Sequence, residues 1–334
     1  MGQNLILNLN DKGFKVCAYN RTVSKVDDFL NNEAKGTEIV GANSLQDLCL
    51  KLKEPRRVLL MVKAGDAVDE FIAALEPFLS PGDVIIDGGN SNFTDTNRRC
   101  RELALKGLHF VGCGVSGGEE GARHGPSMMP GGSEAAWPLI REMFQAIAAK
   151  VSNPKELDVC CDWVGPEGSG HFVKMVHNGI EYGDMLLIAE AYHLLKNGLG
   201  IEGEELAQIF ADWNKDELSS FLIEITADIL DFKDDKGQRI VERIRDAAGQ
   251  KGTGKWTVMA ALETGTPVTL IGEAVFARAL SAMKSERLVA SKLLPDSSNK
   301  TEISSELKSA MISNIREVSK LEQIIRIFMF LCLF

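Results

Sequence analysis

The residues with the clearest capacity for chemistry lie in the middle of the chain. The segment GSGHFVKMVHNGIEYGDM (168–185) contains a lysine, an imidazole, an amide and a carboxylate at Lys174, His177, Asn178 and Glu181. Because a helix has about 3.6 residues per turn, these four side chains would share one helical face. A neutral lysine can act as a general base and a carboxyl group of raised pKa as a general acid. A polar helix face turned to water is the alternative for this segment taken alone.

Two glycine-rich stretches favour a ligand site over a solvated face. The SGGEEG motif (116–121) can bring backbone donors close to a ligand, and DGGNSNFTDT (87–96) places Asn90 directly after an apolar run. A third stretch, GQKGTGKWT (249–257), sets Lys251, Thr253 and Lys255 in a flexible loop, and Arg278 follows in EAVFARAL. These cations suit an anionic ligand, with an ordinary basic loop and a surface arginine as the alternative.

The segment after KVCAYN (15–20) bears on coenzyme choice. This short strand ends in Asn20, Arg21 and Thr22, with Lys25 shortly after. In NAD enzymes an acidic residue near this point accepts a hydrogen bond from the ribose 2′-hydroxyl, whereas an arginine can bind the 2′-phosphate of NADP. The pattern therefore favours NADP, and a solvated helix start with Thr22 as N-cap is the alternative.

The elements that must position these residues change character along the chain. Strand-like runs at 56–62, 83–89 and 108–115 alternate with helical patterns in the first half, which is typical of a parallel sheet covered by helices. From about Gly168 only helical patterns remain. We predict an α/β Rossmann-like doubly wound parallel sheet in residues 1–167, followed by a mainly α-helical domain in residues 168–334.

The start of the chain differs from that of a complete dinucleotide-binding fold. A dinucleotide-binding fold opens with a strand, a GxGxxG turn and a helix, whereas QNLILNLNDKGF (3–14) already has the pattern of that helix. Gly2 would be the last glycine of the turn, and we expect the first strand to be missing. We expect the helical domain to be incomplete as well.

Composition narrows the class of protein. A formal net charge of −10 argues against a general nucleic-acid binder, and the seven cysteines form no zinc-type CxxC pairs. We expect buried thiols in a reducing compartment, and no metal. No signal peptide is recognisable, and the terminal IIRIFMFLCLF is shorter than the roughly 20 apolar residues of a membrane span. We therefore expect a cytosolic protein with no membrane segment.

Taken together with NRTVSKVDDF (20–29), these motifs resemble the 6-phosphogluconate dehydrogenase family, from Met1 to about Lys292, and the resemblance fades from about Leu293. It implies the NADP-dependent oxidation of 6-phosphogluconate at C3, followed by loss of CO2 to give ribulose 5-phosphate. This reaction belongs to the pentose phosphate pathway, and the family's enzymes are homodimers. In this chain, Lys174 would be the general base that later stabilises the enolate, and Glu181 would protonate C1.

The resemblance also assigns binding residues by position. Those at the substrate would be Asn90, Ser116, Gly117, Gly118, His177, Asn178, Tyr182, Lys251, Thr253 and Arg278. Those at the coenzyme would be Gly2, Asn20, Arg21, Thr22, Lys25, Val62, Lys63, Ala64 and Asn90.

Two further functions stay open beside this one. Family members continue into a tail that supplies an arginine and a histidine to the partner's active site, and nothing here matches that tail. We therefore expect the chain alone to be a poor enzyme or an inactive partner of full-length subunits. A β-hydroxyacid dehydrogenase with an unphosphorylated substrate is the other possibility, although Lys251, Thr253 and Arg278 argue against it.

Overall fold

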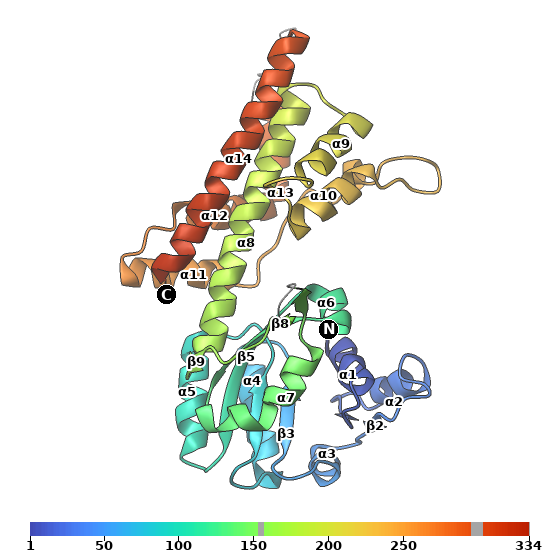
Figure 1. Cartoon of the computed structure of the whole chain (residues 1–334), viewed down its shortest axis with the longest axis vertical. Coiled ribbons are helices and arrows are strands. Elements are labelled where there is room, and N and C mark those ends of the chain that lie inside the picture. The colour runs from blue at the N-terminus through green and yellow to red at the C-terminus, as the bar shows by residue number, and fades with distance from the viewer. Residues whose placement is uncertain (153–156, 295–302, 334) are drawn as a thin grey trace. The chain divides into compact units, whose positions relative to one another are not determined.

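The computed structural model describes residues 1–152, 157–294 and 303–333 (Figure 1). The chain forms two compact units, Met1–Met175 and Val176–Phe334. The division falls inside one helix, α8 (Ser169–His193), whose first two turns belong to unit 1. The domain boundary near residue 167 stays a prediction from the sequence pattern.

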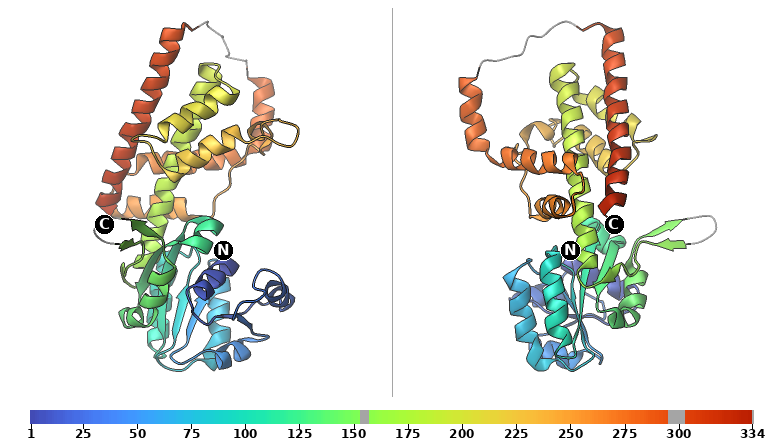
Figure 2. Two further views of the ribbon diagram at one scale, coloured as in Figure 1. Left: turned by 45° about the vertical axis from the view of Figure 1, so that its right-hand side comes forward. Right: turned by 90° about the vertical axis from the view of Figure 1, so that its left-hand side faces the viewer.

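Unit 1 is built on a five-stranded sheet with the order β3-β4-β5-β6-β9. Its pairs are parallel except β5 with β6, which is antiparallel. β1 and β2 form a separate parallel pair, and the β7–β8 hairpin extends away from the main sheet (Figure 2). The strands are β1 (Cys17–Ala18), β2 (Val40–Gly41), β3 (Arg57–Leu60), β4 (Val84–Asp87), β5 (His109–Ser116), β6 (Ser127–Gly132), β7 (Lys150–Ser152), β8 (Leu157–Val159) and β9 (Gly165–Pro166).

Helices cover both faces of this sheet. One face packs on α1 and α7 through Leu5, Ile140 and Phe144, and the other packs on α3, α4 and α5 through residues such as Ile72 and Leu103. β4 reads as a continuous apolar run because both of its faces are buried. The helices of unit 1 before α8 are α1 (Gly2–Asp11), α2 (Ser24–Asn31), α3 (Leu45–Lys51), α4 (Asp66–Leu75), α5 (Phe93–Ala104), α6 (Gly118–His124) and α7 (Trp137–Ile147).

The predicted doubly wound class is confirmed, with two departures from a single parallel sheet. The first is the antiparallel strand β6, whose glycine- and methionine-rich sequence did not read as a strand. The second is that β1–β2 and β3 belong to separate sheets. In the doubly wound strand order, another strand lies between the positions that β1 and β3 occupy here.

Unit 2 is helical, as predicted. Among its described residues there is no strand, only an isolated bridge between Lys233 and Arg239. After α8 and a π-helical turn at Leu194–Gly198 come α9 (Gly203–Trp213), α10 (Phe221–Asp231), α11 (Thr253–Thr264), α12 (Thr269–Ala282), α13 (Lys284–Leu293) and α14 (Ser305–Leu333).

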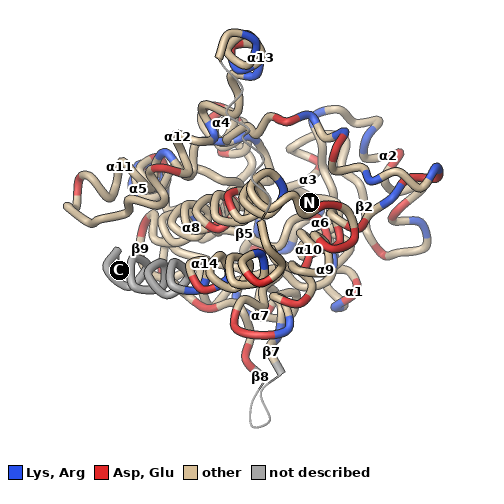
Figure 3. Tube along the Cα trace, turned by 90° about the horizontal axis from the view of Figure 1, so that it is seen from above, with Lys and Arg blue, Asp and Glu red and all other residues tan. Residues whose placement is uncertain are grey.

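The last helix of unit 2 is anchored by packing and charge. α14 runs beside α8 (Figures 1 and 2), and its Ile312 and Ile315 join the core formed by α9 and α10. Ion pairs fix its exposed side, for example Arg316–Asp216 at 2.9 Å and Lys320–Glu217 at 2.6 Å. Acidic and basic residues are interspersed over the described part of the chain, without a long basic tract (Figure 3).

The C-terminal segment was expected to be too short to cross a membrane. No helix among the described residues is long and apolar enough to do so. The side chains of IIRIFMFLCLF lie outside the described residues.

Candidate active site

The first turns of α8 lie directly on the backbone of the sheet. A Cβ added to Gly170 would stand 2.2 Å from the Gly112 carbonyl oxygen and 2.3 Å from that of Met129. One turn later, a Cβ on Gly114 would stand 2.4 Å from the Cβ of Lys174. Glycine is therefore required at these positions. This close approach buries the Lys174 side chain, which is 7% exposed.

His171 joins this helix to two other elements. Its Nδ1 lies 2.7 Å from the Thr96 hydroxyl and its Nε2 lies 3.1 Å from the Asp87 carbonyl oxygen. Because a carbonyl can only accept, Nε2 carries the proton, and the Thr96 hydroxyl donates to Nδ1. Burial lowers the pKa of His171, opposed in part by Asp87, so the neutral imidazole is favoured.

Asp87 organises the turn that follows β4. This fully buried carboxylate accepts hydrogen bonds from the Ser91 hydroxyl at 2.6 Å and from the Gly89 amide at 3.0 Å. These bonds fix the backbone on either side of Asn90, whose side chain is exposed.

Arg99 links the same carboxylate to the loop after β3. Its Nη1 lies 3.6 Å from Asp87, and its other nitrogens bind Asp69 at 2.8 and 2.9 Å and the Gly65 carbonyl at 3.1 Å. The hydrogen bond from Arg99 is the largest cause of the lowered pKa of Asp69. The predicted coenzyme residues Val62, Lys63 and Ala64 immediately precede Gly65.

None of these network residues was predicted from the sequence. The available signal was a charged residue at the end of the apolar run DVIID, because a buried carboxylate requires a partner. The partner, Arg99, comes from a different helix and had no local signal.

The SGGEEG motif forms an exposed turn at the end of β5. Gly117 and Gly118 have φ of 115° and 65°, conformations that favour glycine. α1 supports this turn, since Asn4 donates to the Glu119 carbonyl at 2.9 Å and Asn8 to the Ala122 carbonyl at 3.2 Å. Ser116, the last residue of β5, lies partly buried beside it.

The predicted coenzyme residues lie at the ends of β1 and β3. Asn20, Arg21, Thr22 and Lys25 are exposed, and the Asn20 side chain accepts a hydrogen bond from the Thr22 amide at 2.9 Å. Thr22 is not an N-cap, because α2 begins at Ser24 without a side-chain cap.

Gly2 brings the start of α1 to the end of β3. It is the first residue of α1, and a Cβ added there would lie 3.6 Å from the Met61 side chain. Met61 directly precedes Val62–Ala64, the segment predicted to line the coenzyme. Gly2 therefore lies beside the start of that segment.

In unit 2, the predicted site residues on α8 and α11 pack through glycines. His177 Nδ1 lies 3.4 Å from Glu181 Oε2, an i,i+4 ion pair when the imidazole is protonated. Both side chains and that of Asn178 are partly buried. A Cβ on Gly179 would stand 2.8 Å from the Thr257 side chain, so α8 and α11 approach closely here.

Arg278 lies where α8, α11 and α12 meet. The Arg278 guanidinium stacks 3.9 Å over the Tyr182 ring and donates to the Gly249 carbonyl at 2.8 Å. A Cβ on Gly254 would stand 2.7 Å from the same ring, which places the start of α11 beside it. Free amides and the helix dipole make such a helix start favourable for an anion. Thr253 begins this helix and Lys251 is exposed in the preceding loop.

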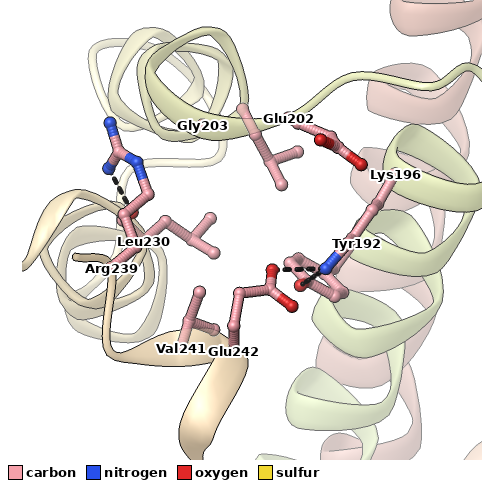
Figure 4. Close-up of a pocket in the computed structure, with 9 residues that line it drawn as sticks. Tyr192, Lys196, Glu202, Gly203, Leu230, Arg239, Val241 and Glu242 are labelled. Atoms are coloured by element: carbon pink, nitrogen blue, oxygen red, sulfur yellow. Dashed lines mark hydrogen bonds and ion pairs between the residues drawn. The ribbon is translucent and has the colours of Figure 1, made fainter.

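A cavity of about 470 Å³ lies elsewhere in unit 2 (Figure 4). Both cations of its lining are paired with carboxylates: Lys196 binds Glu242, and Arg239 binds Asp231 at 3.0 Å. None of the predicted site residues lines it. Its lining residues are Tyr192, Lys196, Glu202, Gly203, Leu206, Leu230, Arg239, Val241 and Glu242.

Cysteine, histidine and carboxylate side chains are the groups of the described residues that could take part in metal or thiol chemistry. No group of three or more His, Cys, Asp or Glu side chains within them could hold a metal ion. The described cysteines are free thiols, and burial raises the pKa of Cys100 and of Cys161 to about 12.

The fold first defines a class. The 3-hydroxyisobutyrate dehydrogenase of Mycobacterium tuberculosis has the same fold, with a TM-score of 0.61 and 20% identity over 84% of this chain and 90% of that one. The class defined here is thus one of fold, an α/β unit followed by a helical unit.

Sequence comparison narrows this class to one family. Residues 1–165 match the model of the NAD binding domain of 6-phosphogluconate dehydrogenase, and residues 170–328 match that of its C-terminal domain. The Plasmodium falciparum 6-phosphogluconate dehydrogenase, solved with NADP+ and with 6-phosphogluconate, is 40% identical with a TM-score of 0.91, covering all of this chain and 71% of that one. The chain belongs to the 6-phosphogluconate dehydrogenase family.

Two mammalian relatives are more similar to this chain in sequence than the Plasmodium enzyme is. The decarboxylating 6-phosphogluconate dehydrogenases of Mus musculus and Homo sapiens are each 68% identical over 294 residues, or 88% of this chain. The match covers 60% of their own length. The chain therefore spans about three fifths of these relatives.

Proposed function

We propose that this chain carries the active-site residues of an NADP-dependent oxidative decarboxylase that converts 6-phosphogluconate to ribulose 5-phosphate and CO2. The observation that carries the proposal is the burial of Lys174 against the sheet of unit 1. Within unit 2, the stacked Tyr182–Arg278 pair beside the start of α11 is the second supporting feature. The first suits proton abstraction and the second suits a phosphate. The similarity to an enzyme solved with this coenzyme and this substrate supports both.

Lys174 is the proposed general base. It would take the proton of the C3 hydroxyl, and NADP, when bound, would supply the acceptor for the hydride that leaves C3. A lysine must be neutral to do this, and burial of its side chain favours the neutral amine. Once protonated, Lys174 stabilises the negative charge that develops on the C3 oxygen as the β-keto acid loses CO2.

Glu181 is the proposed acid that protonates C1 of the resulting enediol. Its carboxylate lies 3.4 Å from His177 Nδ1, so the imidazole can hold it in position. The other proposed substrate contacts are Asn90, Ser116, Gly117, Gly118, Asn178, Lys251 and Thr253.

NADP is the proposed coenzyme, and the residues present fit it. Arg21 and Lys25 are exposed after β1, and the strand end itself, Asn20–Thr22, carries no carboxylate that would repel a 2′-phosphate. Gly2 at the start of α1 and Val62–Ala64 after β3 are the proposed neighbours of the rest of the coenzyme. A cytoplasmic homodimer acting in the pentose phosphate pathway is the proposed setting.

The test is a coenzyme reduction assay with residues 1–334. NADPH absorbance is followed with 6-phosphogluconate, with gluconate as the unphosphorylated control, and with a full-length relative as reference. NADPH formation that depends on the phosphate supports the proposal. Equal turnover of gluconate would favour a hydroxyacid dehydrogenase of another specificity. Folded protein that neither turns over nor binds NADPH in a fluorescence titration would support an inactive partner instead.

A further inference from the structure

We propose that His171 is a positioning residue for Lys174, and that a buried chain of contacts through Asp87 and Arg99 connects it to the loop predicted to line the coenzyme. This inference rests on the proposed role of Lys174. It adds a residue that does not touch the substrate but sets where the base stands.

The hydrogen bonds of the two ring nitrogens of His171 reach different elements. Nε2 donates to the Asp87 carbonyl at the end of β4, and Nδ1 accepts from Thr96 in α5. Since Asp87 also fixes the turn around Asn90, the contact through Nε2 ties α8 to that turn. The contact through Nδ1 ties α8 only to the covering helix.

Lys174 follows His171 by one helical turn. The glycine contacts at Gly112 and Gly114 leave no room for α8 to approach the sheet more closely, but such van der Waals contacts carry less direction than a hydrogen bond. The hydrogen bond to Asp87 supplies that direction. We therefore infer that the hydrogen bond of Nε2 fixes the rotation of α8 and, with it, the position of Lys174.

The chain of contacts continues to the coenzyme side through Arg99. This side chain is 1% exposed and touches Asp87, Asp69 and the Gly65 carbonyl. Gly65 directly follows Val62–Ala64. Its φ of 91° is a backbone conformation that other residues rarely adopt, and the direction of its carbonyl depends on this conformation. One buried network thus touches the loop for the coenzyme, the turn of Asn90 and the helix of the base. All of these residues lie in unit 1.

Two amide substitutions separate the contacts of His171. In His171→Gln, the amide nitrogen occupies the place of Nε2 and can still donate to the Asp87 carbonyl. In His171→Asn, the amide occupies the place of Nδ1 and can still reach Thr96, but the bond to Asp87 is lost. Thr96→Val is the matched control, because it removes the Thr96 contact of His171, together with the bond of this hydroxyl to the Asn92 carbonyl, and leaves the Asp87 contact in place.

The first readout is steady-state kinetics. Because a 1 Å misplacement can cost on the order of 10²-fold in rate, we expect His171→Asn to lower kcat roughly 10- to 100-fold with KM for 6-phosphogluconate nearly unchanged. We expect His171→Gln and Thr96→Val to retain most of the turnover. Equal losses in His171→Asn and His171→Gln, at equal melting temperatures, would overturn the proposal.

The second readout needs no turnover. Acetic anhydride labels neutral amines, so mass spectrometry of the Lys174 peptide over a pH series reports the environment of this amine; Lys174→Met confirms the peptide. We expect the midpoint of labelling to move in His171→Asn but not in His171→Gln. Absence of any movement in both variants overturns the positioning role. If the parent shows no turnover while the labelling still separates the two variants, the proposed function fails and the positioning role stands.

The coenzyme arm has its own variant. Arg99→Lys keeps the charge but cannot bind Asp69 with two nitrogens and Gly65 at once. We expect weaker NADPH binding in a fluorescence titration, together with a shifted labelling midpoint at Lys174. Weaker NADPH binding without that shift would refute the connection between the two sites.

Discussion

The two units hold their candidate site residues in different ways. In unit 1, Lys174 stands on a helix that packs against sheet backbone and is tied by buried hydrogen bonds through His171 and Asp87. In unit 2, the guanidinium of the half-exposed Arg278 stacks over the Tyr182 ring. Lys251 is exposed and lies two residues before Thr253 in the sequence. The first arrangement fixes the position of the Lys174 side chain, whereas the second presents the partly exposed, charged side chain of Arg278 to a ligand.

This difference separates two kinds of expected effect. Changes in unit 1 should act on the chemical step, because small displacements of a base cost rate. Changes in unit 2 should act on binding of the charged substrate, in a manner that added salt weakens. The predictions below follow from this contrast.

The largest expected effect is that of Lys174→Met. Removing a general base lowers kcat by about 10²–10⁴-fold, and we expect the far-ultraviolet circular dichroism to be unchanged. Steady-state kinetics measure the loss, in the full-length relative if the turnover of this chain is too low. Lys106→Met, at an exposed lysine that pairs with Glu76, is the control. A loss below threefold would remove Lys174 from the chemical step.

Arg278→Gln should act on substrate binding instead. A charge-assisted contact contributes about 1.5–3 kcal/mol, so KM for 6-phosphogluconate should rise roughly 10- to 100-fold, and kcat should change much less. The control is Arg287→Gln. Arg287 lies in α13, and its guanidinium binds Asp246. If kcat falls as strongly as in Lys174→Met, the contrast between the units is wrong.

Arg21→Glu tests the predicted coenzyme residues of unit 1. Because their side chains are exposed, they should differ least from the candidate site residues of unit 2. A carboxylate would repel the 2′-phosphate, so we expect NADP to bind on the order of tenfold more weakly relative to NAD, as for loss of one charge-assisted contact. Lys35→Glu is the control, since this exposed lysine follows α2. Fluorescence titration with both reduced coenzymes gives the ratio, and an unchanged ratio contradicts the role of Arg21.

The smallest effect concerns stability and pH. The pKa of His171 is lowered in the folded chain from an ordinary value of 6.5, so the unfolded chain binds more protons just below that pH. The stabilising contribution is therefore complete above pH 6.5 and is lost as pH falls below it, by about 1.4 kcal/mol per pH unit until the folded group titrates.

Urea unfolding at several pH values measures this slope. We expect His171→Gln to flatten it between pH 6.5 and 5. The pKa of Asp69 is lowered too, so its contribution should be lost only below about pH 4. The same slope in the parent and in His171→Gln would show that His171 is not the group responsible.

The sequence predicted the elements well where patterns were long. The apolar run DVIIDGG and the helical pattern after Gly168 correspond to β4 and α8, and the doubly wound class followed from their alternation. β6 escaped prediction because its glycines are required by close backbone contacts, such as that of Gly131 with Gly170, rather than by strand propensity.

The candidate site divides in the same way. Lys174, His177, Asn178 and Glu181 were predictable because one helix carries them all. The stacking of Arg278 on Tyr182 and the network of Asp87 with Arg99 join elements far apart in sequence, and no local pattern reports which helix will cover which strand. The role of the sheet glycines under α8 likewise depends on tertiary approach alone.

The outer faces of α11–α13 have a practical consequence for such measurements. α13 buries no residue, and large apolar side chains on these helices are exposed, among them Leu262, Phe276 and Leu293. Solvatochromic dyes that report unfolding by binding apolar surface would already fluoresce in the native chain and obscure a melting transition. Intrinsic fluorescence avoids this, because each unit has its own indoles, Trp137 and Trp163 in one and Trp213 and Trp256 in the other. Replacing one pair by phenylalanine would let the melting of each half be recorded without an added probe.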